Sequence, residues 1–97
     1  MPLLTPEDFE PWVGRRVRVS TVPQAVEVTL ERIERRPALA PGLDFREPFS
    51  LFFDAPAGVY LLDATYEFDC GKGGPHAIHI TQLVPSATLR HYQAVFN

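Results

Sequence analysis

The chain has 97 residues, the length of one domain, which we expect to span residues 1–97 and to bury a core without disulfides or metals. Hydrophobic residues make up 45% of the sequence and charged residues 22%, a balance that excludes a disordered chain. The formal net charge of −3 argues against nucleic acid and anionic membrane surfaces as partners, because both attract basic proteins.

The number of cysteines and the lengths of the hydrophobic runs indicate the cellular compartment of the protein. Cys70 is the only cysteine, so neither an internal disulfide nor a multi-cysteine zinc site can form, and we expect a reducing compartment. The N-terminus does not have the pattern of a signal peptide, and no stretch approaches the ~20 apolar residues of a membrane span. These features predict a cytoplasmic protein that does not enter a membrane.

A short helix is predicted near the N-terminus. Thr5 suits the position that caps a helix, and Pro6 suits the first helical position. Glu7 and Asp8 then place negative charge at the positive end of the helix dipole. Pro11 disfavours helical geometry in the residue before it, so we expect one to two turns.

Two strands are predicted to follow. Residues 15–21 and 25–35 alternate between apolar and polar side chains, the pattern of half-buried strands. If the two strands pair, the outer arginines of the first lie across from the outer glutamates of the second, which favours that register. Ile33 breaks the alternation. We interpret the break as a β-bulge near Glu31-Arg32 or as a bend at a barrel corner.

The longest stretch without periodicity runs from residue 36 to residue 48. It contains three prolines and a glycine together with the apolar residues Leu39, Leu43 and Phe45. Loops of this length in compact domains are often functional. Two interpretations are open: the apolar residues close one end of the barrel, or they bind a protein partner.

An aromatic run of five residues predicts the central strand, because it is too apolar to lie in water and too short for a helix. Phe49, Leu51 and Phe53 share one face of this strand. Ser50 and Phe52 share the other face, so a large aromatic ring on that side also needs a cover.

The second half of the chain predicts further strands. Segments 59–62 and 66–70 suggest one broken strand or two short ones, and segments 76–84 and 89–97 each suggest one more. The glycine-rich residues 71–75 are expected to form a hairpin loop. The total is six to seven strands and one short N-terminal helix, a mostly β domain built as a small antiparallel barrel or sandwich.

No catalytic or metal-binding arrangement is predicted. His76 and His79 are three residues apart on a strand, so their side chains point to opposite faces and cannot hold one ion. Cys70 continues the alternation of Tyr66 and Phe68, which predicts a buried, inert thiol. We therefore expect neither an enzyme nor a cofactor.

The ending Tyr92-Gln93-Ala94-Val95-Phe96-Asn97 resembles that of a family of small bacterial proteins catalogued only as a domain of unknown function, whose usual ending is Tyr-Glu-Ala-Val-Phe-Asn. The central strand followed by Pro56, and Leu83-Val84-Pro85, are also similar. Thr65 and Gln93 depart from the family pattern, where glycine and glutamate are usual. Members are often encoded beside phage-tail-collar-like proteins. The resemblance therefore implies an accessory of a tail-like or surface-fibre assembly, incorporated into such a particle, and it implies no enzymatic activity.

Two hypotheses of function remain. The first is a non-enzymatic interaction module that docks on a protein partner through a sheet edge or through the loop that carries Leu39, Leu43 and Phe45, with homo-oligomers formed through an open last strand. The alternative is a barrel that binds a small ligand, such as a carbohydrate, by stacking it on aromatic rings. The rings expected to line the mouth of that barrel are Trp12, Tyr60, Tyr66 and Tyr92.

Overall fold

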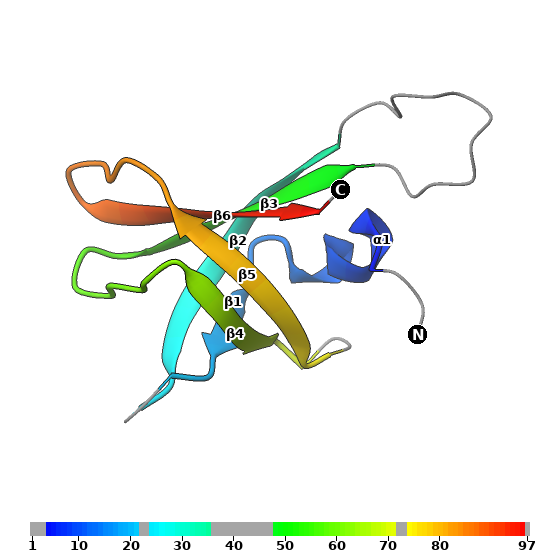
Figure 1. Cartoon of the computed structure of the whole chain (residues 1–97), viewed down its shortest axis with the longest axis horizontal. Coiled ribbons are helices and arrows are strands. Elements are labelled where there is room, and N and C mark those ends of the chain that lie inside the picture. The colour runs from blue at the N-terminus through cyan, green and yellow to red at the C-terminus, as the bar shows by residue number, and fades with distance from the viewer. Residues whose placement is uncertain (1–3, 22–23, 36–47, 72–73, 97) are drawn as a thin grey trace.

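The computed structural model describes residues 4–21, 24–35, 48–71 and 74–96. Its six strands form a closed antiparallel barrel in the order β1-β2-β3-β6-β5-β4 (Figure 1). The mostly β prediction is therefore confirmed, with a barrel as the architecture. The strands are β1 (Arg16–Val19), β2 (Val26–Arg35), β3 (Phe49–Pro56), β4 (Ala64–Asp69), β5 (His76–Gln82) and β6 (Leu89–Phe96).

β3 is the most extensively paired strand. It pairs with β2 on one side and with β6 on the other, and every residue of β3 has a partner in β6. Phe49, Leu51 and Phe53 are buried, as their shared face predicts. Inward residues of the other strands complete the core: Val17, Val19, Val28, Leu30, Phe68, Ile78, Ile80, Tyr92 and Ala94.

The register of β1 against β2 follows the charge pattern. Arg18 lies opposite Glu27, as expected of outer arginines facing outer glutamates. The predicted bulge is also confirmed, because the pairing of β2 with β3 shifts between Leu30 and Arg32. As a consequence of this shift Arg32 pairs with Phe52, so its side chain lies on the outer face over that ring.

The last strand is not an open edge. β6 pairs with β3 along its whole length and with β5 through Thr81–Gln93 and Gln82–Tyr92. The expectation of an open last strand is therefore wrong, because closure of the barrel gives β6 two neighbours. Strand pairing with β5 is limited to these two positions, and beyond them the backbone N–H of Leu83 donates to the carbonyl of His91 at 2.9 Å.

The predicted N-terminal helix is confirmed as α1 (Pro6–Phe9), which continues into the 3-10 helix η1 (Glu10–Trp12). The Asp8 carboxylate accepts a hydrogen bond of 2.8 Å from the backbone N–H of Thr5, which caps the first turn. Gly14 then turns the chain with φ of 80°, a conformation that glycine adopts without strain. Among the described residues, no helix is long and apolar enough to cross a membrane.

Aromatic side chains from this helical segment close one end of the barrel. Phe9 and Trp12 are fully buried and meet edge to face, with ring centroids 5.1 Å apart. Trp12 also stacks on His76 at the start of β5, at 5.7 Å. Phe49 and Phe96 stack in parallel at 4.5 Å beside Phe9. The helical segment therefore fills the end where β5 and β6 no longer pair.

Arg35 of β2 forms ion pairs with the same helical segment, and replacing Arg35 should change the pKa of Glu7. One Arg35 guanidinium nitrogen lies 3.1 Å from the Glu7 carboxylate, and the other contacts Glu10. The pKa of Glu7 is lowered, first by a backbone hydrogen bond and then by Arg35. We expect Arg35→Gln to raise the pKa of Glu7 toward its ordinary value, as measured by NMR titration.

The sign of the accompanying stability effect follows from linkage. Because the folded-state pKa of Glu7 is lowered, its contribution to stability is present above the ordinary glutamate pKa and is lost as the pH falls through the lowered value. The unfolding curves of wild type and Arg35→Gln should therefore converge in acid. Arg16→Gln is the control, since Arg16 pairs with Glu27 instead. An identical Glu7 titration in wild type and Arg35→Gln would contradict the assignment.

Candidate interaction site

The end of the barrel opposite α1, called the distal end below, is formed by residues 57–63 and 83–88 (Figure 1). The prediction of a strand over 59–62 is wrong. Backbone N–H and C=O groups of this segment form hydrogen bonds with side chains instead of with a neighbouring strand. The Tyr92 hydroxyl accepts a hydrogen bond from the N–H of Leu61 and donates one to the carbonyl of Val59, both at 2.9 Å. The segment is thus held as an ordered loop.

Further contacts fix the loop to β5 and β6. The backbone N–H of Gln82 donates to the Asp63 carboxylate at 2.8 Å. Arg90 donates through its Nε to the carbonyl of Ala57 at 2.7 Å, and its guanidinium lies over the Tyr60 ring, 4.9 Å from the centroid. The distal end therefore presents side chains from a braced backbone, which lowers the entropy lost on binding.

Four large apolar side chains are exposed at the distal end. Tyr60 is 58% exposed, Leu62 63%, Val84 87% and Leu89, at the start of β6, 36%. Among the described residues only Val13 and Val95 are other exposed large apolar side chains, and they lie elsewhere. Single exposed apolar residues are common on soluble proteins, whereas several on adjoining segments mark an interaction site.

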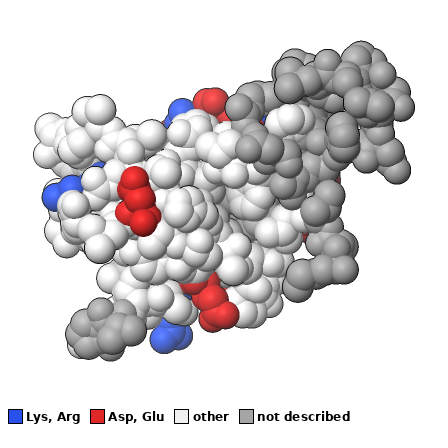
Figure 2. All heavy atoms as spheres, viewed as in Figure 1, with Lys and Arg blue, Asp and Glu red and all other residues white. Residues whose placement is uncertain are grey.

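Charged side chains show no comparable concentration on the face seen in Figure 2. Acidic and basic residues are scattered there, and some lie next to a residue of opposite charge. Ion pairs join exposed charged groups elsewhere in the described chain as well, including Arg16 with Glu27 at 3.8 Å. Such a mixed surface offers no strong field to attract an oppositely charged polymer.

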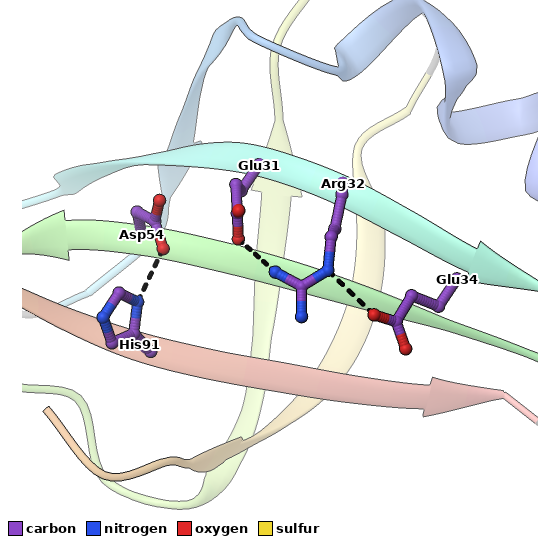
Figure 3. A network of polar contacts seen from close by, with 5 residues as sticks. All are labelled: Glu31, Arg32, Glu34, Asp54 and His91. Atoms are coloured by element: carbon purple, nitrogen blue, oxygen red, sulfur yellow. Dashed lines mark hydrogen bonds and ion pairs between the residues drawn. The ribbon is translucent and has the colours of Figure 1, made fainter.

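A polar network covers the outer face of β2, β3 and β6 (Figure 3). Arg32 lies between two carboxylates, donating to Glu34 at 2.8 Å and to Glu31. Its guanidinium lies 4.0 Å from the centroid of the Phe52 ring. Arg32 therefore supplies the cover that the outer ring of the central strand requires, as a cation–π contact.

The Asp54–His91 pair lies beside this network, joining β3 to β6. His91 Nδ1 is 2.7 Å from Asp54 Oδ1, and both side chains are partly buried. A groove of about 290 Å³ lies between the pair, Arg32, Phe52 and Val84. Its polar groups already contact one another, so the groove offers a braced polar surface bordering the distal end.

The structure separates the three histidines. His76 faces inward against Trp12, whereas His79 faces outward, with its Nδ1 3.2 Å from the Thr65 hydroxyl. The two therefore point to opposite faces of β5, as the spacing predicts. Across the part of the chain that the structure describes, no three His, Cys, Asp or Glu side chains come together as a potential metal site.

The four rings expected to line one mouth are not brought together. Trp12 is buried at the α1 end, and the Tyr92 ring is buried with its hydroxyl bonded to residues 57–63. Tyr60 is exposed at the distal end, and the half-buried Tyr66 donates its hydroxyl to Leu62 at 3.1 Å. Three tyrosines thus surround one loop, but only Tyr60 is largely accessible.

Leu39, Leu43 and Phe45 lie outside the described residues, so their role in binding stays a prediction. Arg35, at the end of β2, pairs with Phe49, at the start of β3. Both strand ends lie at the α1 end of the barrel, opposite the distal end (Figure 1).

Sequence reasoning missed the distal end and the Asp54–His91 pair. Asp54 and His91 are 37 residues apart, and only the register of β3 against β6 makes them neighbours. The strand that the sequence predicts over 59–62 does not indicate that Leu62 is exposed. Pro56 and Gly58 before Tyr60, and Pro85 after Val84, were the available signal, since such residues mark loops.

Together these features define a small closed β-barrel domain, plugged at one end by a helical segment and carrying exposed apolar residues at the other. The chain belongs to the family described as Domain of unknown function (DUF6916), whose model matches residues 4–96. Comparisons with curated proteins and with solved structures found no match.

Proposed function

We propose that the protein is a non-enzymatic interaction module that binds a protein partner through its distal end. The observation that carries this proposal is the group of four exposed apolar side chains there, Tyr60, Leu62, Val84 and Leu89. Leaving them in water costs free energy that a partner would recover by covering them. Hydrogen bonds brace the loop beneath them, so binding needs little ordering of the chain.

The sequence resemblance leads to a finer proposal. The resemblance to proteins encoded beside phage-tail-collar-like proteins favours a partner within a tail-like or surface-fibre assembly, into which this protein would be incorporated. A compact barrel without a catalytic group at its exposed end suits such an accessory role. The small-ligand alternative is less favoured, because Trp12 and Tyr92 are buried and Tyr60 alone offers little stacking surface.

Affinity capture from a host lysate tests the proposal. The tagged wild type, the double variant Leu62→Asp/Val84→Asp and the control Val95→Asp are compared, followed by mass spectrometry. Val95 is also exposed and apolar but lies near the opposite end of β6. We expect one protein other than the bait to be enriched with wild type and with the control, and to fall at least about tenfold with the double variant.

Two results would count against the proposal. Recovery of the same proteins with all three baits and with a tag-only sample would show that the distal end binds nothing specifically. Equal loss with Val95→Asp would place the contact elsewhere or indicate misfolding. Circular dichroism of each variant separates these two causes, because a folded barrel keeps its β spectrum.

A further inference from the structure

One strand of the barrel is paired on only one side over part of its length. β2 pairs with β1 from Val26 to Thr29, but its pairing with β3 begins only at Thr29, opposite Asp54. Among the described residues, no strand therefore pairs with residues 26–28 on the β3 side. Although the barrel is closed, β2 keeps a short free edge at its first residues.

A proline explains why the pairing of β2 with β3 stops. Alternate residues of a strand direct their backbone N–H and C=O groups to opposite sides. The N–H of Leu30 donates to the carbonyl of Arg15, on the β1 side, so Glu27, three residues earlier in β2, directs its groups toward β3. The continued register would place Pro56 opposite Glu27, but proline has no N–H, and the Pro56 carbonyl accepts from Val59 at 2.9 Å. The backbone N–H and C=O of Glu27 thus face a strand end that does not pair with them.

A groove lies along this free edge. Its volume is about 510 Å³, large enough to hold a ligand. Glu27 and Thr29 line it from β2, and Pro56 and Leu89 line it from β3 and β6. A second hollow, of about 630 Å³, shares Glu27 with the groove and includes Ala25. The two hollows follow β2 and the residue before it, and the groove adjoins the distal end at Leu89.

We propose that β2 accepts an extended segment of a partner protein as an additional strand, which pairs with Glu27 and lies in this groove. The inference rests on the proposed function and deepens it by naming the form in which the partner binds. The β2 wall offers a backbone donor and acceptor, which an extended chain can pair with and a helix cannot, because a helix uses its own backbone groups internally. Pro56 and Leu89 form an apolar opposite wall, so the bound segment should place an apolar side chain there.

A surface-displayed library of random decapeptides supplies the probe, and two variants of Glu27 separate backbone from side chain. Glu27→Pro removes the N–H that faces the groove, whereas Glu27→Ala keeps that N–H and removes only the carboxylate, which forms an exposed ion pair with Arg16. We expect decapeptides selected on wild type to bind Glu27→Ala within about threefold of wild type and Glu27→Pro at least about tenfold more weakly. Equal weakening by the two substitutions, or selection of no decapeptide, would overturn the proposal.

Amide hydrogen exchange measured by NMR on the wild-type protein is a readout that does not depend on the folding of a variant. The Glu27 amide should exchange rapidly in the free protein, and a selected decapeptide should slow it at least about tenfold. The Thr29 amide, already paired opposite Asp54, should change much less. A decapeptide that binds and leaves the Glu27 amide unprotected would overturn the proposal. If circular dichroism shows that Glu27→Pro does not fold, this measurement alone decides.

This inference and the proposed function fail separately. If lysate capture depends on Leu62 and Val84 but no decapeptide protects the Glu27 amide, the interaction module stands and strand addition is overturned. If a decapeptide protects the Glu27 amide but lysate capture is unchanged in Leu62→Asp/Val84→Asp, strand addition stands and the exposed apolar residues of the distal end are not the docking surface.

Discussion

Replacing Trp12 with alanine is expected to lower the free energy of unfolding by about 3–5 kcal/mol, because it leaves a cavity where a fully buried indole stood. The ring contacts Phe9 edge to face and stacks on His76, so the substitution disturbs both. A domain of this size has a total stability of about 5–15 kcal/mol, so the loss would be a large fraction. Urea unfolding followed by circular dichroism measures it, since Trp12 is the only tryptophan.

Trp12→Phe is the matched variant for this experiment. It keeps an aromatic ring in the same site and should lose clearly less stability than Trp12→Ala. Arg35→Gln, which changes only the exposed ion pairs of the same segment, should change stability little. If the free energy of unfolding of Trp12→Ala lay within about 1 kcal/mol of the wild-type value, the helical segment would not plug the barrel as the structure indicates.

Removing one oxygen at Tyr92 is expected to have the second largest effect. Tyr92→Phe leaves the buried N–H of Leu61 and the carbonyl of Val59 without the hydroxyl that each contacts at 2.9 Å. A buried polar group that loses its partner costs about 1–3 kcal/mol. We expect that loss in urea unfolding, and amide hydrogen exchange at Leu61 should become at least several-fold faster than in wild type.

Tyr66→Phe provides the control, because it removes the hydroxyl oxygen of another tyrosine that forms a hydrogen bond with the same loop. The Tyr66 hydroxyl donates to the carbonyl of Leu62 at 3.1 Å, but this bond is exposed to water. Its loss should cost about 0.5 kcal/mol or less, since water can replace it. Equal effects of the two substitutions would indicate that Tyr92 does not hold the loop from within the core.

These predictions also bear on the distal end. If Tyr92 braces residues 57–63, Tyr92→Phe should weaken any contact made by Tyr60 and Leu62 without altering either side chain. The same lysate capture experiment would detect the weakening. A loop that binds equally well after Tyr92→Phe would show that its order does not matter for binding.

Much of the fold was predictable because it depends on neighbours in sequence. The alternation in β1 and β2, the bulge between Leu30 and Arg32, and the first turn of α1 are each determined by a few consecutive residues. The inward face of β3 follows from the same period of two. Single residues and their immediate neighbours carry these signals.

Only the tertiary structure decided which surfaces face the solvent. The register of β3 against β6 places Asp54 beside His91, and the burial of Tyr92 under residues 57–63 turns an apparent strand into a loop. Closure of the barrel gives β6 a second neighbour and removes the open edge that the sequence predicted. Each outcome depends on contacts between residues far apart in the chain. Local patterns determine which side of a strand is apolar, whereas many long-range contacts together determine which other strand it pairs with.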